Sequence, residues 1–513
     1  MIVPFTVSDF LDRAATVYGD RVGLYDEPDQ PAPSWGDLTY AEMGRRARRI
    51  AARLDELGVG VGERVAMVSH NSGRLLTSFW GVSGFGRVLV PVNFRLSRDE
   101  VAYIVEHSGA KVLFVDPELE DALTGVEGSA HTFVIGKDED LMVDGDDADP
   151  RPWDSPDENA TATINYTSGT TARPKGVQMT HRNIWVDATT FGWHAGVTDR
   201  DVYLHTLPMF HCNGWGMPFA MAGMGVPQVV LRKVDGMEIL RRVDQHGVTI
   251  MCAAPAVVAA VLDAAPHWDG PIPGRDRTRI VVAGAPPPSR TIQRVEEELG
   301  WEFIQIYGLT ETSPLLTINR TRQEWDDLSA QDRAHKLMLA GSPAIGVRLK
   351  VDDEGEVLAR SNVVLAGYWE NPEETERVLD GGWFHTGDGG TIGDDGYLTI
   401  QDRKKDVIIT GGENVSSIEV EDAIFSHPDV AEVAVIGVPD EKWGETIKAL
   451  VVKAEGSSLT EAELIEYVKG KVARYKAPSS VEFREVLDRT ATGKLQKFKL
   501  RAPYWEGRDR QVN

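Results

Sequence analysis

The chain has 513 residues, and its 54 Lys and Arg residues against 79 Asp and Glu residues give a formal charge of −25. That length exceeds the usual size of one domain, and a hydrophobic content of 42% excludes a largely disordered chain. The negative charge argues against a nucleic-acid partner, because phosphate backbones are bound by clustered Lys and Arg side chains.

The two cysteines, Cys212 and Cys252, are too few for a disulfide framework or a thiolate zinc cluster. We therefore expect a reducing, cytoplasmic setting. The first residues, Met1 to Thr6, lack the basic and apolar pattern of a signal peptide, and no apolar run reaches about eighteen residues. We expect neither a signal peptide nor a transmembrane segment.

Helix and strand signals alternate through the first part of the chain. Two capping-box patterns predict helix starts, at Thr39 with Glu42 and at Ser97 with Glu100. Apolar runs predict buried strands at 64–68 and 111–115. Strands that alternate with helices in this way indicate an α/β fold, with doubly wound parallel sheets that helices cover on both faces.

Later segments change character. The acidic stretch 137–149 predicts a solvated loop, and beyond about Gly341 short strands and glycine turns predict a β-rich subdomain. After the charge run at 402–406, a small α+β unit is predicted, with capping boxes at Ser416 with Glu419 and at Thr460 with Glu463, and strands at 431–438 and 448–452. We therefore expect an N-terminal domain over 1–401 and a C-terminal domain over 407–513.

A loop rich in hydroxyl groups is the most informative segment. From Tyr166 to Val177 it reads Tyr-Thr-Ser-Gly-Thr-Thr-Ala-Arg-Pro-Lys-Gly-Val. Its hydroxyls and backbone amides suit phosphate oxygens, and Lys175 adds a positive charge. The spacing fits neither a Walker A loop, because Lys175 precedes Gly176, nor a nucleophile elbow, because Tyr166 stands where Gly is required. A plain Ser/Thr/Gly turn would explain the glycines but not the basic residues beside a proline.

This loop resembles the phosphate loop TSGTTGxPKG of the adenylate-forming superfamily, which comprises acyl-CoA synthetases, firefly luciferase and the adenylation domains of peptide synthetases. The loop departs from the family pattern at one position, where Ala172 replaces the last loop glycine. The added methyl group disfavours positive φ. The resemblance runs from about residue 6 to 502. It implies that ATP is bound by Thr167, Ser168, Gly169, Thr170, Thr171 and Lys175.

Further family motifs follow in the same order. The segment Tyr307-Gly308-Leu309-Thr310-Glu311 resembles the second nucleotide motif. By this resemblance Tyr307 lies against adenine, Thr310 contacts the α-phosphate, and Glu311 holds Mg²⁺ together with Thr167. A hard carboxylate oxygen suits that ion. The adenine-side loop of the family is matched by Gly284, Ala285 and Pro286.

Three later motifs complete the nucleotide site that the resemblance implies. Asp388, which follows Thr386-Gly387, would accept hydrogen bonds from both ribose hydroxyls. The run 402–406 matches the interdomain hinge, where Arg403 would reach the nucleotide and Lys405 would be the pivot. Lys494, in a segment similar to PRTxxGK, would bridge the substrate carboxylate and the α-phosphate.

Together these motifs imply two-step activation of a carboxylic acid with ATP, Mg²⁺ and coenzyme A. The carboxylate attacks the α-phosphate and pyrophosphate leaves, and then the thiol of coenzyme A displaces AMP while the C-terminal domain swings about the hinge. The expected catalytic residues are Lys494, Thr310, Glu311 and His211. Coenzyme A contacts are implied for Arg95, Gly411, Gly412, Trp443 and Arg474. The resemblance also allows a homodimer.

The segment from Pro208 to Trp215 resembles PMFHVNAW of fatty acyl-CoA synthetases. The resemblance implies that His211 lines the acyl site and that Trp215 gates a fatty-acid tunnel, so a medium- to long-chain fatty acid is the first expectation. Short thioether acids such as 3-(methylthio)propanoate, aryl acids, and a carrier protein in place of coenzyme A stay open. We interpret Cys212 as a packing residue rather than a nucleophile paired with His211, because strand neighbours face opposite ways.

Overall fold

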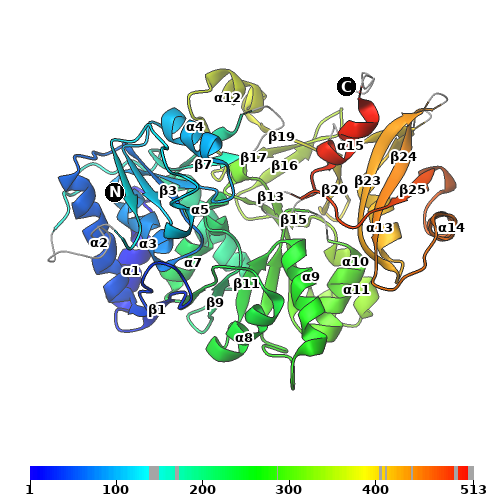
Figure 1. The fold of residues 1–513 in the computed structure, drawn as a ribbon, viewed down its shortest axis with the longest axis horizontal. Helices are drawn as coiled ribbons and strands as arrows, with labels where there is room; N and C mark the ends of the chain where they lie inside the picture. Colours follow the sequence, from blue (N-terminus) through cyan, green and yellow to red (C-terminus); the bar gives the residue numbers. More distant parts are fainter. Residues whose placement is uncertain are drawn as a thin grey trace.

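The computed structural model describes residues 1–137, 149–167, 173–285, 287–403, 407–410, 413–440, 443–489 and 495–506. Most of the predicted loop at 137–149 therefore lies outside the described residues. Figure 1 shows a large N-terminal part that contains the α/β sheets and a smaller C-terminal domain beside it.

A first sheet is built from the alternating segments near the N-terminus. Its strands lie in the order β18, β8, β7, β4, β3, β5, β6, and the neighbours from β7 to β6 pair in parallel. The helix starts predicted at Thr39 and Ser97 are confirmed, because both capping boxes close reciprocally. The bounds are β3 Arg64–Val68, β4 Val88–Val92, β5 Val112–Val115, β6 His131–Val134, β7 Thr161–Thr167, β8 Lys175–Thr180, β18 Gly367–Tyr368, α2 Tyr40–Glu56, α3 Gly73–Gly81 and α4 Arg98–Ser108.

A second sheet shares a hydrophobic core with the first. Its order is β15, β14, β13, β12, β11, β9, β10, β1, β2, and the run from β13 to β1 is parallel. Helix α5 contacts strands of both sheets. The strands are β1 Val22–Tyr25, β2 Asp37–Thr39, β9 Tyr203–His205, β10 Gln228–Val230, β11 Ile250–Ala253, β12 Arg279–Val282, β13 Glu302–Gly308, β14 Leu315–Asn319 and β15 Ser342–Pro343. The helices are α1 Ser8–Val17, α5 His181–Ala195, α6 Cys212–Trp215, α7 Met217–Met224, α8 Gly236–His246, α9 Pro255–Ala264, α10 Ser289–Arg294 and α11 Ala330–Leu337.

The predicted β-rich subdomain is an antiparallel sheet in the order β16, β17, β19, β20. Its strands are β16 Arg348–Val351, β17 Glu356–Arg360, β19 Phe384–Ile392 and β20 Leu398–Arg403. The short helix α12 Pro372–Val378 links β18 of the first sheet to β19. This connection brings α12 close to the strand that begins at Lys175, because β18 pairs with β8.

The C-terminal domain has a hydrophobic core of its own, to which Ile408, Val435 and Val468 belong. The strands predicted at 431–438 and 448–452 are confirmed, and Thr460 caps its helix as predicted. The elements are β21 Ile408–Thr410, β22 Glu413–Val415, β23 Val430–Asp440, β24 Gly444–Lys453, β25 Ser480–Phe483, α13 Ser417–Phe425, α14 Glu461–Lys469 and α15 Lys497–Trp505.

The capping box predicted at Ser416 is wrong. The hydroxyl of Ser416 donates to the backbone oxygen of Gln401 at 2.8 Å and does not cap α13. A second contact between the domains lies nearby, where the backbone N–H and the hydroxyl of Ser289 donate to Asp422 at 3.0 and 3.2 Å. Tertiary contacts across the boundary therefore replace the local cap that the sequence pattern indicated.

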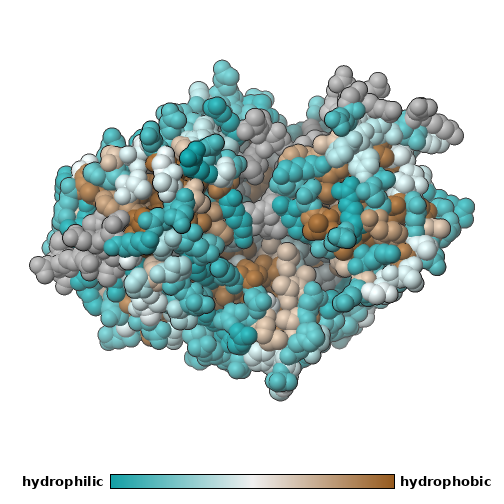
Figure 2. All heavy atoms as spheres, in the orientation of Figure 1, coloured by the Kyte–Doolittle hydropathy of each residue, from teal (hydrophilic) through white to brown (hydrophobic). Residues whose placement is uncertain are grey.

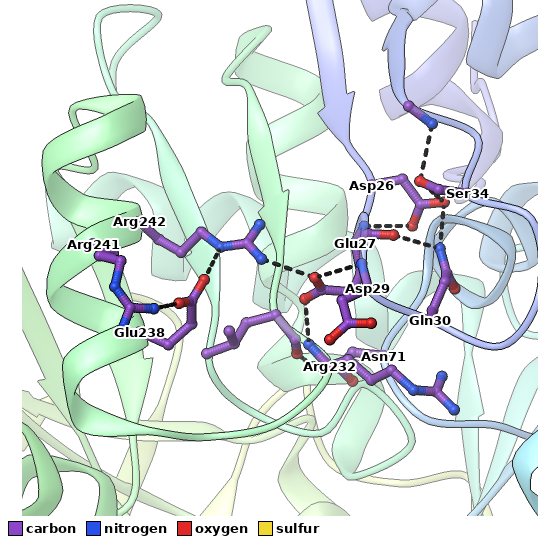
Figure 3. Close-up of polar contacts among 12 residues, drawn as sticks. Asp26, Glu27, Asp29, Gln30, Ser34, Asn71, Arg232, Glu238, Arg241 and Arg242 are labelled. Atoms are coloured by element: carbon purple, nitrogen blue, oxygen red, sulfur yellow. Dashed lines mark hydrogen bonds and ion pairs between the residues drawn. The ribbon is translucent and has the colours of Figure 1, made fainter.

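Buried charged side chains join the two large sheets where their parallel strands end. Arg232, just after β10, donates two hydrogen bonds of 2.9 and 2.7 Å to Asp116, just after β5. Figure 3 shows Glu27 beside Arg232 and Arg242, and Arg242 donates to one Glu27 oxygen at 2.8 Å. The other Glu27 oxygen accepts the backbone N–H of Arg232 at 3.2 Å. Arg232, Asp116, Glu27 and Arg242 thus each have a partner of opposite sign, which offsets their desolvation.

Asn71, just after β3, ties this junction to the segment that contains His211. Its side-chain amide donates to the backbone oxygens of His205, Leu207 and Leu231, and its oxygen accepts the N–H of Met209 at 2.8 Å. One buried side chain therefore holds in place the ends of strands from both sheets and the start of the segment from Pro208 to Trp215. This segment is called the acyl segment below, after its expected role.

Within the described residues, no helix combines the length and the apolar composition that a bilayer crossing requires. Figure 2 shows hydrophilic residues over most of the visible face and hydrophobic residues in separate patches. Cys212 and Cys252 are both free and buried.

Candidate active site

The end of β13 and the middle of β19 bring two of the predicted nucleotide motifs together. The hydroxyl of Tyr307 donates to Asp388 at 2.8 Å, although 81 positions separate the two residues in the chain. Asp388 is buried, and its backbone N–H donates to the hydroxyl of Thr386. In the pairing of β19 with β20, Arg403 stands opposite Asp388. An aromatic face and a carboxylate are therefore side by side, as a nucleoside requires.

The turn after Tyr307 requires a glycine. A Cβ atom on Gly308 would lie 1.6 Å from the backbone oxygen of Pro314, which is far inside van der Waals contact. The turn leads into a short helix in which Thr310 is buried and Glu311 is half-buried. These two residues follow Tyr307 directly, so the second nucleotide motif forms one compact unit.

Tyr368 of β18 connects Glu311 to Lys175. Its hydroxyl donates to Glu311 Oε1 at 2.8 Å, and its ring centroid lies 5.5 Å from the Lys175 ammonium. Burial, with a further contribution from the Glu311 carboxylate, raises the pKa of Tyr368, so the phenol stays protonated and donates. Thr167 pairs with Lys175 across β7 and β8. Thr167, Lys175 and Glu311 therefore gather at one end of the first sheet.

Several predicted residues lie outside the described part of the chain. They are Ser168, Gly169, Thr170 and Thr171 of the phosphate loop, Pro286, the pivot Lys405, Gly411 and Gly412, and Lys494. Next to Pro286, Gly284 is exposed with φ +100° and open space where a side chain would stand, and Ala285 is half-buried.

The acyl segment forms a left-handed turn instead of the strand that the sequence interpretation assumed. Residues 212–216 all have positive φ, at 47, 52, 61, 62 and 71°. The amide of Asn213 supports this costly backbone, because it donates to Thr163 at 2.8 Å and accepts from Asn165 at 3.1 Å. The strand assumption for Cys212 and His211 was therefore wrong. The support for the turn comes from β7, which lies far away in the chain, so no local sequence pattern predicts it.

The side chains of this turn point into the core. Trp215 is 5% exposed and Cys212 is buried, whereas His211 is half-buried. Burial raises the pKa of the Cys212 thiol well above its usual range, and the Asp187 and Glu311 carboxylates raise it further. A thiol that stays protonated is a poor nucleophile, so Cys212 has the packing role that we inferred.

Asp187 was missed by the sequence analysis. It lies on the buried face of α5 with Ile184, Ala188 and Phe191, and its Oδ1 accepts the backbone N–H of Leu315 at 3.1 Å. Its Oδ2 has no hydrogen-bond partner within the described structure and lies 2.3 Å from where a Cβ of Gly216 would stand. Burial raises the pKa of this carboxyl group well above its usual range. The sequence did contain a signal for Asp187, because it is an acidic residue at a position of α5 where the helical period predicts an apolar side chain.

The residues predicted to contact coenzyme A are divided between the two domains. Arg95 is exposed in the large domain and lies over the ring of Phe94 at 4.5 Å. That ring stacks on His70 at 3.8 Å and contacts Phe210, the neighbour of His211, at 5.5 Å. Trp443 and Arg474 are exposed on the C-terminal domain. A continuous aromatic wall thus leads from Arg95 to the acyl segment.

Comparison with known proteins agrees with this geometry. The AMP-binding enzyme family matches residues 11–369, and its C-terminal domain matches residues 419–494. The chain is 39% identical to a 2-methylpropanoate–CoA ligase of Humulus lupulus over 97% of this chain and 95% of that protein, and 36% identical to a 4-hydroxybutyrate–CoA ligase of Metallosphaera sedula over 96% and 93%. The solved structure of an anthranilate–CoA ligase in complex with anthranoyl-AMP superimposes with a TM-score of 0.87 at 27% identity over 98% of both chains. The chain belongs to the AMP-binding enzyme family, within the adenylate-forming superfamily, and is an AMP-forming acid–CoA ligase.

Proposed function

We propose that this ligase activates a short aliphatic carboxylic acid. The observation that carries the proposal is the burial of the region around the acyl segment. Residues 209–220, which comprise most of the acyl segment and the start of α7, are buried except for His211. Trp215 is 5% exposed at the end of this segment, and a bulky side chain held there would leave little room for a long acyl chain. Two relatives are named for four-carbon acids, 2-methylpropanoate and 4-hydroxybutyrate, which supports the same size of substrate.

The roles of the site residues follow from the charges that meet during adenylation. Two anions, the carboxylate and the α-phosphate, approach each other, and a like-charge pair at about 4 Å costs about 4 kcal/mol at an effective dielectric of about 20. Lys175, Thr167 and Thr310 would bind phosphate oxygens, and Lys494 would lie between carboxylate and phosphate. Tyr307 and Asp388 would hold the nucleoside, with Gly284 and Ala285 on the adenine side.

Magnesium fits the donor groups at this end of the site. Glu311 offers a carboxylate, and one of its oxygens is already oriented by the Tyr368 hydroxyl at 2.8 Å. Hard oxygen donors of this kind suit Mg²⁺, with Glu311 and Thr167 as the protein ligands. The bound ion would neutralise phosphate charge, and the protein's own part is to orient Glu311 and to present Lys175.

A medium- to long-chain fatty acid is a second candidate, favoured by the likeness of the segment from Pro208 to Trp215 to that of fatty acyl-CoA synthetases. Thioether acids such as 3-(methylthio)propanoate, aryl acids and a carrier-protein acceptor are further arms of the same test. For coenzyme A, the residues along its path would be Arg95, Gly411, Gly412, Trp443 and Arg474. A cytoplasmic location agrees with the two free cysteines.

One assay separates these proposals. Pyrophosphate release and thioester formation are measured over aliphatic acids of increasing length, aryl acids and thioether acids, with coenzyme A or a carrier protein as acceptor. We expect the highest kcat/KM for a branched or linear four-carbon acid and strict dependence on coenzyme A. The highest kcat/KM for a long-chain acid would contradict the short-acid proposal. Turnover with the carrier protein but not with coenzyme A would contradict coenzyme A as the acceptor.

A further inference from the structure

Lys175 is bound by a carboxylate that lies outside the phosphate loop. Its ammonium lies 2.5 Å from Oε1 of Glu374, and the two side chains are only 22% and 16% exposed. Glu374 sits in the first turn of α12, where the side chain of Asn371 accepts its backbone N–H at 3.2 Å. The lysine that is proposed to bind phosphate therefore already has an anionic partner that a neighbouring element fixes in place.

Glu374 has a second cation, so it does not depend on Lys175. Arg377, one turn further along α12, donates to both carboxylate oxygens at 2.7 and 2.8 Å. The hydrogen bonds from Arg377, followed by that from Lys175, lower the pKa of Glu374 to about 2. If Lys175 leaves, the Glu374 carboxylate stays ionised and paired with Arg377, which lowers the free-energy cost of releasing the lysine.

Space for an incoming anion lies beside this ion pair. A pocket of about 480 Å³ is lined by three cations, Arg173 at the end of the phosphate loop, Lys175 and Arg377, and by the acidic side chains of Glu370, Glu373 and Glu374. The Tyr368 ring contacts the Lys175 ammonium, and its hydroxyl holds Glu311. A released ammonium thus stays beside the proposed metal ligand.

We propose that Glu374 is a positioning residue that holds Lys175 in the nucleotide-free enzyme and is displaced from it by the phosphates of ATP. Glu374 thereby sets the apparent affinity for ATP. This inference rests on the proposed phosphate contact of Lys175. The carboxylate and the phosphates compete for one ammonium, so removing the carboxylate makes ATP bind more tightly.

The test is a double-mutant cycle on the full-length enzyme. The dissociation constants of ATP and of its α,β-methylene analogue are measured by calorimetry for the wild type, Glu374→Gln, Lys175→Met and the double variant. A partly exposed ion pair corresponds to a change of about fivefold, so Glu374→Gln should tighten nucleotide binding by about fivefold and lower the KM for ATP. In the Lys175→Met background the same substitution should change nothing, because no ammonium is left to compete for.

Two further variants sharpen the cycle. Glu376→Gln removes an equal charge from an exposed position of α12 that does not line this pocket, and it should leave the affinity for ATP unchanged. Arg377→Gln removes the second cation of Glu374, so Lys175 is held more firmly. ATP binding should weaken more while Lys175 is present than in the Lys175→Met background, where only the direct effect of losing a cation from the pocket remains. Thermal unfolding of each variant verifies that the fold is intact, as expected for Arg377, whose side chain is 66% exposed.

Three results would overturn the inference. Unchanged or weaker binding in Glu374→Gln means that no competition exists. Equal tightening in both backgrounds means that Glu374 merely repels the nucleotide. Unchanged binding in Lys175→Met means that the lysine contacts no phosphate. The acid–CoA ligase assay on the wild type decides the proposed function separately, since it does not depend on Glu374.

Discussion

At the scale of single residues, Asp187 shows how burial changes chemistry. Burial raises the pKa of its carboxyl group well above the value near 3.9 that it has in the unfolded chain. The folded protein therefore binds more protons than the unfolded one between that pH and its raised pKa. Over this range stability falls as the pH rises.

Asp187→Asn should remove this pH dependence. The amide has nearly the same shape and does not titrate, so the slope of up to about 1.4 kcal/mol per pH unit that Asp187 contributes disappears. We expect the urea midpoint of the variant, followed by tryptophan fluorescence, to rise relative to wild type between pH 5 and pH 7. Asp20→Asn, at an exposed position, serves as the control. Its urea midpoint relative to wild type should not change between pH 5 and pH 7. A parallel shift at both pH values would mean that Asp187 is ionised in the fold.

Trp215 sets the length of the acid if the turn closes the acyl site. Trp215→Ala removes a large buried side chain, which costs about 3–5 kcal/mol of stability and leaves space beyond the turn. We expect kcat/KM to shift toward longer acids, whereas the KM for ATP changes little. The acid panel on the variant checks this. An unchanged chain-length profile would assign Trp215 to core packing alone.

At the scale of elements, local patterns predicted what local interactions decide. Capping boxes at Thr39, Ser97 and Thr460 form as predicted, because each is closed within one turn of chain. Ser416 does not, because its hydroxyl finds a carbonyl in another domain. The left-handed turn at 212–216 was unpredictable for the same reason, since its support comes from Thr163 and Asn165, about 50 positions earlier.

The candidate site shows the same division. The resemblance named Tyr307, Asp388, Lys175 and Glu311, and the fold brings Tyr307 to Asp388 and Lys175 near Glu311. No motif names Glu374, because an acidic residue in the first turn of a helix is an ordinary terminal charge until the tertiary fold places a lysine against it.

The turn after β13 depends on one missing side chain. Gly308→Ala would push a methyl group against the Pro314 backbone, and backbone clashes of this kind displace the turn at a cost of at least 1–3 kcal/mol. We expect ATP affinity, measured by calorimetry, to fall at least tenfold because Tyr307 and Thr310 move together. Gly60→Ala, where the added carbon would meet its nearest atom at 3.8 Å, is the matched control. Equal effects of both substitutions on ATP affinity would contradict this account.

At the scale of the whole molecule, the two half-reactions are expected to need two placements of the C-terminal domain. The described structure holds that domain against the large one through Ser289 with Asp422 and through Arg290, which donates to the backbone oxygen of His427 at 3.1 Å. The rotation that the family resemblance implies for 402–406 would have to break these bonds. Ser289 and Arg290 closely follow the adenine-side loop in the chain. The contacts that hold the C-terminal domain are therefore next to the expected nucleotide site.

Lys494 and Lys405 lie outside the described residues, and their roles stay predictions. Lys494→Ala should slow adenylation about a thousandfold if it removes an interaction of about 4 kcal/mol, yet should convert supplied acyl-adenylate and coenzyme A at a near wild-type rate. Lys405→Pro should do the reverse, because proline fixes φ and blocks the pivot. Single-turnover assays of both half-reactions decide this. Equal loss of both steps in both variants would leave the two-placement mechanism without support.

The junction around Arg232, Asp116 and Asn71 determines when the enzyme loses conformational entropy at the acyl segment. These buried groups fix the floor beneath the acyl segment when the chain folds, so the ordering cost is met once, during folding, and not at every catalytic cycle. If the C-terminal domain swings as the family resemblance implies, the large domain can stay fixed while it moves, and substrate binding energy remains available for bringing the carboxylate to the α-phosphate.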